Sequence, residues 1–159
     1  MIYLYTDGAN SLKTKVGGYA AILVNEQDEL ITTLVESFCN RPTNNMVELA
    51  GVIFGLDYII NHPELGKEVT VISDSEYVVL GASERLDRWI AKGWKCTTGP
   101  VKNKPLWEAI NSFKSQLNIT WKWVRGHNGN KWNEKCDTLA VASYKKLLID
   151  NATISGKLS

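Results

Sequence analysis

Hydrophobic and polar positions alternate in three short segments near the start of the chain. Residues 2–8, 19–24 and 30–38 are rich in β-branched, aliphatic and aromatic side chains, which favour strands. Short polar segments separate them, and the pair Gly17-Gly18 is typical of a turn. We therefore predict three strands, connected in sequence as an antiparallel meander.

The pattern then changes to helical spacing. Apolar residues recur at intervals of three or four from Leu49 to Ile60, and Thr43 or Asn44 can cap the start of this helix. Residues 68–73 form the next predicted strand. A strand that follows a crossover helix normally runs parallel to its neighbour, so its carboxyl end should lie beside that of the first strand.

The rest of the chain continues this alternation of helices and strands. We expect a short helix from Ser75, a basic helix over residues 85–95, a helix over 105–117, a fifth strand over 119–124 and a final helix that includes Trp132 and Leu147. The prediction is an α/β fold with a mixed five-stranded sheet, three antiparallel strands followed by two parallel ones, and helices on both faces. One domain should span residues 1–150, followed by a frayed polar tail, residues 151–159.

Composition and charge narrow the class of protein. A length of 159 residues with 44% hydrophobic content suits one globular domain, and no apolar run approaches transmembrane length. The three cysteines lie far apart, which predicts reduced thiols in a cytoplasmic protein. Residues 1–80 hold 4 basic and 11 acidic side chains, whereas residues 81–159 hold 14 and 6. This asymmetry favours a polyanionic partner on one surface and cation binding on another, although the two halves can also attract each other.

Four acidic residues fall at strand ends or at the borders of apolar helix stripes. Asp7 and Asp74 end the first and fourth strands, and Glu48 and Asp137 lie beside buried positions of two helices. Each alone has an ordinary explanation, such as an Asp-Gly turn or a glutamate at a helix rim. Together they would repel one another unless a cation lay among them, and oxygen ligands suit Mg²⁺ or Mn²⁺. The pattern therefore predicts a metal site that can hold two ions.

A second feature is the stretch from Arg85 to Lys104, which contains six basic residues, one acidic residue and two tryptophans. Cations interleaved with aromatic rings suit contact with a nucleic-acid backbone and its bases. The alternative is a solvated helix that docks on the core through Trp89 and Trp94. We expect these rings to serve packing at least in part, with the cations facing outward.

At five places the chain resembles type 1 ribonuclease H, and the resemblance covers roughly residues 1–148. The matching segments are Tyr5-Thr6-Asp7-Gly8, Thr43-Asn44-Asn45 with Glu48-Leu49, Ser73-Asp74-Ser75, Trp94-Lys95 with Pro100-Val101-Lys102-Asn103, and Trp123-Val124-Arg125-Gly126-His127 with Asn133-Glu134-Lys135-Cys136-Asp137. The fold implied is ribonuclease H-like. The activity implied is cleavage of the RNA strand of an RNA–DNA hybrid, leaving 5′-phosphate and 3′-hydroxyl ends.

The resemblance also implies roles for the acidic residues. Asp7 would contact two Mg²⁺ ions, with Mn²⁺ as a substitute, Glu48 and Asp74 would complete one metal site, and Asp137 would complete the other. One ion would activate the attacking water and the other would stabilise the departing 3′-oxygen. His127, in a loop flanked by glycines, would shuttle a proton or help the product phosphate leave.

Substrate contacts follow from the same resemblance. The residues implied are Gly8, Asn44, Asn45 and Glu48 at the minor groove, where the 2′-hydroxyl marks RNA, with Glu76 near the RNA, Thr43 at a phosphate, and Trp89, Lys92, Trp94, Lys95 and Lys102 in a protrusion that grips the DNA strand. Lys13, Met46 and Glu76 depart from the common family pattern and affect the expected affinity and cleavage preference. We expect a monomer that needs no membrane and no obligate protein partner.

Two other interpretations use the same fold. One is a catalytically silent module that binds hybrids or duplex RNA, and the other is a nuclease that cuts duplex DNA as transposases and resolvases do. A mere binder gains nothing from four carboxylates placed beside phosphates, which favours an enzyme.

Overall fold

The secondary structure follows the predicted alternation closely. A computed structural model describes residues 1–11, 13–126 and 128–158, and for residues 151–158 it describes the backbone alone. Its elements are β1 (Ile2–Ser11), β2 (Val16–Val24), β3 (Leu30–Phe38), α1 (Asn44–Ile60), the 3₁₀ turn η1 (Pro63–Leu65), β4 (Glu68–Ser73), α2 (Glu76–Leu80), the π-helical turn η2 (Gly81–Arg85), α3 (Leu86–Ala91), β5 (Lys95–Cys96), β6 (Gly99–Pro100), α4 (Lys104–Lys114), β7 (Asn118–Trp123) and α5 (Lys131–Leu158).

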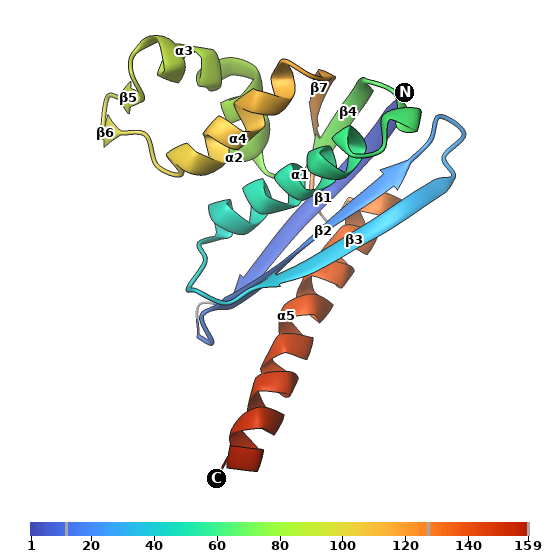
Figure 1. Ribbon diagram of the computed structural model, residues 1–159, viewed down its shortest axis with the longest axis vertical. Coiled ribbons are helices and arrows are strands. Elements are labelled where there is room, and N and C mark those ends of the chain that lie inside the picture. The colour runs from blue at the N-terminus through green and yellow to red at the C-terminus, as the bar shows by residue number, and fades with distance from the viewer. Residues whose placement is uncertain (12, 127, 159) are drawn as a thin grey trace.

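The central sheet has five strands in the order β3-β2-β1-β4-β7. β1 pairs antiparallel with β2, and β2 pairs antiparallel with β3. β4 pairs parallel with β1 on one side and with β7 on the other. This arrangement confirms the predicted three antiparallel and two parallel strands. The crossover through α1 returns the chain to the middle of the sheet, as Figure 1 shows.

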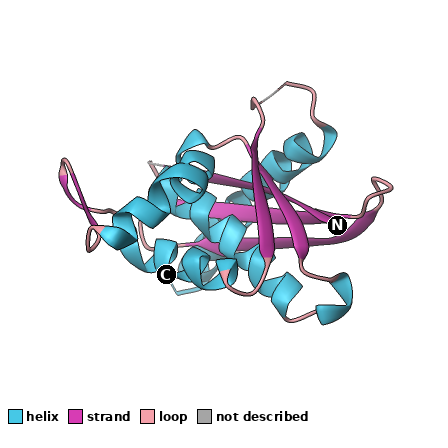
Figure 2. Ribbon diagram, turned by 90° about the horizontal axis from the view of Figure 1, so that it is seen from above, coloured by secondary structure: helices cyan, strands magenta, loops and turns pink. Residues whose placement is uncertain are grey.

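Alternate residues of the strands face two different layers of helices. In β2, Ala21 and Leu23 belong to a large buried cluster that includes residues of α1 and α4. Ala20 and Ile22 point to the other face and join a smaller cluster formed with α5. Figure 2 shows helices on both sides of the strands. The predicted two-sided α/β architecture is therefore confirmed.

The predicted turn at Gly17-Gly18 is wrong, because both glycines lie inside β2. A Cβ at Gly18 would collide with the backbone oxygen of Ala140 in α5. A Cβ at Gly17 would lie 2.9 Å from Cγ1 of Val47 in α1. The two glycines let helices approach the strand closely from opposite sides, so here they serve packing and not chain reversal.

The predicted basic helix over residues 85–95 is shorter in the structure. α3 ends at Ala91, because Gly93 (φ 68°) and Trp94 (φ 65°) adopt left-handed backbone conformations. The predicted loop that follows contains the small antiparallel pair β5–β6. With α3, this hairpin projects from the helices beside α4 in Figure 1.

The last helix, α5, runs along one face of the sheet and extends beyond it in Figure 1. After Asp150, where we expected the polar tail to be frayed, the described backbone remains helical through Leu158. Among the residues that the structure describes, no helix is long and apolar enough to cross a membrane.

Candidate active site

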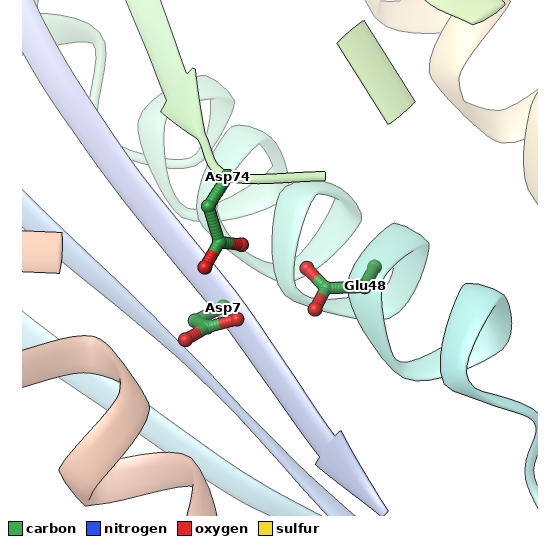
Figure 3. A group of neighbouring side chains, drawn as sticks. All are labelled: Asp7, Glu48 and Asp74. Carbon is green, nitrogen blue, oxygen red and sulfur yellow. The ribbon is translucent and has the colours of Figure 1, made fainter. Parts of the chain in front are cut away.

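Three of the four predicted carboxylates form one compact group. Asp7 lies in β1, Asp74 directly follows β4, and Glu48 lies in α1. One oxygen of each side chain lies within 4.8 Å of the corresponding oxygens of the other two. Figure 3 shows the three carboxyl groups facing one another across the space between the strands and the helix.

Strand register places the two aspartates at the same level. β1 and β4 are parallel, and Tyr5 pairs with Ile72. Asp7 and Asp74 each follow these paired residues by two positions. Parallel strands direct their carboxyl ends to one edge of the sheet, which is where ligands bind in open α/β folds.

Glu48 reaches this edge because α1 crosses β1 at a glycine. A Cβ at Gly8 would lie 2.6 Å from the carbonyl carbon of Val47 and 2.8 Å from the backbone nitrogen of Glu48. No other residue type permits this approach, since only glycine lacks a Cβ. Helix α1 itself begins at the predicted cap, where Thr43 Oγ1 accepts a hydrogen bond from Met46 N at 3.2 Å.

The electrostatics of the group are unfavourable without a cation. Asp7 is 3% exposed and Glu48 is 5% exposed. Burial, with a smaller effect from the Asp74 charge, raises the pKa of Asp7 to about 7, although Gly8 N donates a hydrogen bond to Asp7 Oδ1 at 2.9 Å. Burial and the Asp7 charge raise the pKa of Glu48 well above its ordinary value.

One carboxylate oxygen in this group has no hydrogen-bond donor, which indicates a position for a cation. Glu48 Oε2 is buried and has no hydrogen-bond partner. A buried acceptor without a donor is costly, and a cation at this position would satisfy it. The available donors are carboxylate oxygens, which are the ligands that Mg²⁺ and Mn²⁺ prefer. The residues therefore fit a divalent metal ion.

Asp137 approaches the same region from the other face of the sheet. It follows the buried Cys136 in α5 and is itself half-buried. It lies outside the compact group of three, but its charge contributes to the raised pKa of Asp7. The fourth predicted carboxylate is thus a neighbour of the group. His127, the predicted proton shuttle, lies outside the described residues.

The residues predicted to read the substrate lie close in sequence to the three carboxylates. Asn44 is exposed and begins α1, and Asn45 is half-buried one turn before Glu48. Gly8 is buried directly after Asp7. Glu76 is exposed at the start of α2, two residues after Asp74.

A hollow of about 290 Å³ beside Thr43 is lined by two basic residues, Lys15 and Arg41, that were not predicted to contact substrate. Its lining residues are Asn10, Ser11, Lys15, Arg41, Pro42, Thr43 and Asn44. Arg41 N donates a hydrogen bond to the backbone oxygen of Lys15 at 3.1 Å, which holds the two cationic segments together. The sequence did offer a signal for Arg41, because it is a basic residue that directly precedes Pro42 and the helix cap Thr43.

The predicted protrusion divides into a supporting and an exposed part. Trp89 is 9% exposed, and its ring centroid lies 5.3 Å from that of the fully buried Trp107. Its ring therefore packs in the core, the structural role that we expected it to have at least in part. Trp94 is half-buried, and the predicted cations Lys92, Lys95 and Lys102 are exposed. Lys95 lies in β5, and Lys92 and Lys102 flank the β5–β6 hairpin in sequence.

Comparisons with known proteins agree with this geometry. The sequence pattern of the ribonuclease H family matches residues 1–145. Ribonuclease H of Hahella chejuensis is 37% identical over 155 residues, covering 92% of this chain and 95% of that protein, and ribonuclease H of Herminiimonas arsenicoxydans is 41% identical over 142 residues, covering 87% and 91%. Among solved structures, an N-terminal ribonuclease H domain from Mycobacterium tuberculosis has a TM-score of 0.70 at 26% identity, covering 98% of this chain and 97% of that one. The chain therefore belongs to the ribonuclease H family of hydrolases.

Proposed function

We propose that this protein is an endonuclease that hydrolyses the RNA strand of RNA–DNA hybrids and leaves 5′-phosphate and 3′-hydroxyl ends. The observation that carries the proposal is the compact group of Asp7, Glu48 and Asp74 at the ligand-binding edge of the sheet. The proposal is also supported by the relatives named ribonuclease H, which match most of the chain. A buried cluster of acids, together with exposed lysines elsewhere on the chain, suits a polyanionic substrate whose cleavage needs a cation.

We further propose that the carboxylates hold two Mg²⁺ ions when substrate is bound, with Mn²⁺ as a substitute. Asp7, Glu48 and Asp74 would hold one ion, and Asp7 with Asp137 would hold the other. When bound, the ions supply activation of the attacking water and stabilisation of the departing 3′-oxygen. The hydrogen bond from Gly8 N fixes the orientation of the Asp7 carboxylate before any ion or substrate arrives.

Recognition of the RNA strand has to depend on the 2′-hydroxyl group, because only that group distinguishes RNA from DNA at the cutting site. The proposed readers are the backbone at Gly8, the amides of Asn44 and Asn45, and the Glu48 carboxylate. All four belong to β1 or to the first turns of α1, so they hold the reacting strand against the carboxylates. Glu76, exposed at the start of α2, is proposed to contact the same strand. His127 is proposed, from its motif alone, to move a proton or to help the product leave.

The DNA strand is proposed to lie along two cationic regions. The first is the β5–β6 hairpin, with Lys95 in β5, Lys92 and Lys102 on either side of it in sequence, and Trp94 as a ring contact. Trp89 supports this protrusion from the core. Thr43, with the hollow that Arg41 and Lys15 border, is proposed to receive a phosphate of the same strand.

The decisive experiment is cleavage of an end-labelled RNA–DNA hybrid, with Mg²⁺ and with EDTA, beside duplex DNA and duplex RNA. We expect RNA-strand cleavage only of the hybrid and only with Mg²⁺. Asp74→Asn should retain the fold by circular dichroism and lose cleavage, because only the charge that holds the metal changes. Binding of the hybrid without cleavage would overturn the proposal in favour of a binding module, and faster cleavage of duplex DNA would point to a DNA nuclease.

A second measurement tests the proposed grip on the DNA strand. Replacing Lys92, Lys95 and Lys102 by glutamine should weaken hybrid binding and lower the slope of log affinity against log salt by about 2–3, roughly one per phosphate contact. The rate at saturating hybrid should change little, because the three lysines are remote in sequence from the carboxylates. An unchanged salt slope would move the grip to another surface.

A further inference from the structure

The fourth carboxylate of the site depends on a different part of the molecule from the other three. Asp7, Glu48 and Asp74 belong to β1, α1 and the end of β4, which share the large buried cluster. Asp137 belongs to α5, which packs on the opposite face of the sheet through the smaller cluster. The position of Asp137 relative to Asp7 is therefore set by whatever holds the start of α5.

Two hydrogen bonds hold that start against the sheet. Trp132 Nε1 donates to Asp28 Oδ1 at 2.6 Å, a bond between residues 104 positions apart in sequence. Cys136 Sγ donates to the backbone oxygen of Tyr5 at 3.3 Å. Trp132 and Cys136 are four residues apart, so they lie on the same side of the helix, and Asp137 directly follows the second anchor.

The acceptor for Trp132 belongs to a hydrogen-bonded hairpin turn between β2 and β3. Asn25 Oδ1 accepts hydrogen bonds from Gln27 N at 3.0 Å and from Glu29 N at 2.9 Å. Asp28 N donates to the backbone oxygen of Asn25 at 3.1 Å, and Asp28 adopts a left-handed φ of 63°. These bonds fix the turn internally, so its carboxylate is presented to α5 in one orientation.

The contact is partly shielded from water and is flanked by a cation. Trp132 is 7% exposed, whereas the Asp28 side chain is 65% exposed. Lys131 Nζ lies 3.9 Å from Asp28 Oδ2 and 4.3 Å from the centroid of the Trp132 ring. A short hydrogen bond to a charged acceptor is stronger than a bond between neutral groups, and here the donor is buried.

We infer that Asp28 is a positioning residue for the active site. Through Trp132 it fixes the first turns of α5, and thereby the distance from Asp137 to Asp7. This inference rests on the proposed function, because it assigns Asp28 to the same reaction. Its expected signature is a lower kcat with an unchanged KM, since the hybrid is held by other elements and only the placement of one carboxylate changes.

The test begins with Asp28→Gly, because glycine adopts a φ of 63° without strain and lacks the carboxylate. We expect kcat for hybrid cleavage to fall about three- to tenfold while KM stays within about twofold. Trp132→Phe removes the indole donor, keeps an aromatic ring, and should give the same result. Asp28→Asn retains an acceptor oxygen and tolerates the left-handed conformation, so it should restore kcat.

Glu26→Ala is the matched control, because Glu26 lies in the same turn and carries the same charge. Its carboxylate pairs with the amino group of Met1 at 3.2 Å and not with α5. It should leave kcat unchanged. In NMR spectra without metal or substrate, the Trp132 indole N–H resonance should move in Asp28→Gly and stay in place in Glu26→Ala.

The outcomes separate this inference from the proposed function. If the wild-type protein fails to cut hybrids, the proposed function is rejected, and this inference with it. If the wild-type protein cuts and Asp28→Gly keeps the wild-type kcat, the inference alone is overturned. A loss of thermal stability in Asp28→Gly with no change in kcat has the same meaning, because the bond would then be merely structural.

Discussion

The two faces of the sheet are built in different ways. On the α1 face, fully buried residues such as Leu4, Leu56 and Trp107 form one large apolar cluster. On the α5 face the buried cluster is small, and hydrogen bonds from Trp132 and Cys136 supplement it. Apolar contact is non-directional, whereas a hydrogen bond fixes a geometry. We conclude that the first face supplies most of the stability, and that the second face orients α5.

The difference between the two faces matters for the carboxylates of the active site. The raised pKa values of Asp7 and Glu48 mean that the metal-free site costs free energy when these groups ionise. Such a cost is tolerable only where the supporting elements are deeply buried, as β1 and α1 are. Asp137 is half-buried and lies outside the compact group of three carboxylates, so a smaller core with directional anchors suffices.

The largest expected effect comes from truncating the same residue type on each face. Leu56 in α1 is fully buried, and Leu139 in α5 is half-buried. Leu56→Ala should lower the free energy of unfolding by about 2–5 kcal/mol, the range for truncated core leucines. Leu139→Ala should cost about 1–2 kcal/mol, because it buries less apolar surface. Urea unfolding of both variants measures the difference, and equal losses would contradict the division between the faces.

The acidic group should make the metal-free protein less stable as pH rises. The pKa of Asp7 is raised from 3.8 to about 7, so between these values the folded protein keeps a proton that the unfolded chain has released. Folding then takes up protons, and stability falls as pH rises through this window. At about 1.4 kcal/mol per pKa unit, the loss over this whole window should be on the order of 4 kcal/mol.

Urea midpoints in the presence of a chelator, at pH 4.5 and pH 7.5, measure this loss. Asp7→Asn cannot ionise, so its stability should fall less than that of the wild-type protein over the same interval. At pH 7.5 the variant should be the more stable of the two proteins. Parallel pH profiles for both would show that the buried carboxylate carries no such cost.

Local patterns and one rule of topology were enough to predict much of the site. The rule that crossover-linked strands run parallel placed Asp7 and Asp74 at one edge, and the structure confirms their register. Helical spacing put Glu48 at the border of a buried stripe, where it does reach the aspartates. These inferences needed only contacts that follow directly from the order of the elements.

Features that depend on distant pairs could not be predicted in this way. The bond between Asp28 and Trp132 joins residues 104 positions apart, and neither residue carries a signal that names the other. Gly18 was predicted to be a turn residue. In the structure a glycine is needed there because Ala140, in a helix more than a hundred residues later, packs against it. Sequence pattern reports local conformation, whereas close approach between elements is a property of the folded molecule.

The smallest expected effect sharpens the comparison through two glycines, Gly18 in β2 under α5 and Gly51 in α1 facing the sheet. A Cβ at Gly18 would collide with the backbone oxygen of Ala140 and would lie 2.9 Å from Cβ of Ser143, so α5 would have to move. A Cβ at Gly51 in α1 would lie 3.3 Å from the nearest atom, the backbone oxygen of Ala20. Helix α1 would need to shift only slightly, and alanine also favours the helix by up to ~1 kcal/mol over glycine.

Gly18→Ala should therefore lower the free energy of unfolding by about 1–3 kcal/mol, the usual cost of overpacking. Gly51→Ala should change it by less than about 1 kcal/mol, because the crowding and the helix preference oppose each other. Calorimetric unfolding measures both, and hybrid cleavage at a temperature where both variants are folded adds the functional comparison. Since Gly18 lies beneath the helix that carries Asp137, its variant should also lose kcat, whereas Gly51→Ala should not. Equal kcat values in the two variants would mean that α5 can shift on its small core without moving the Asp137 carboxylate.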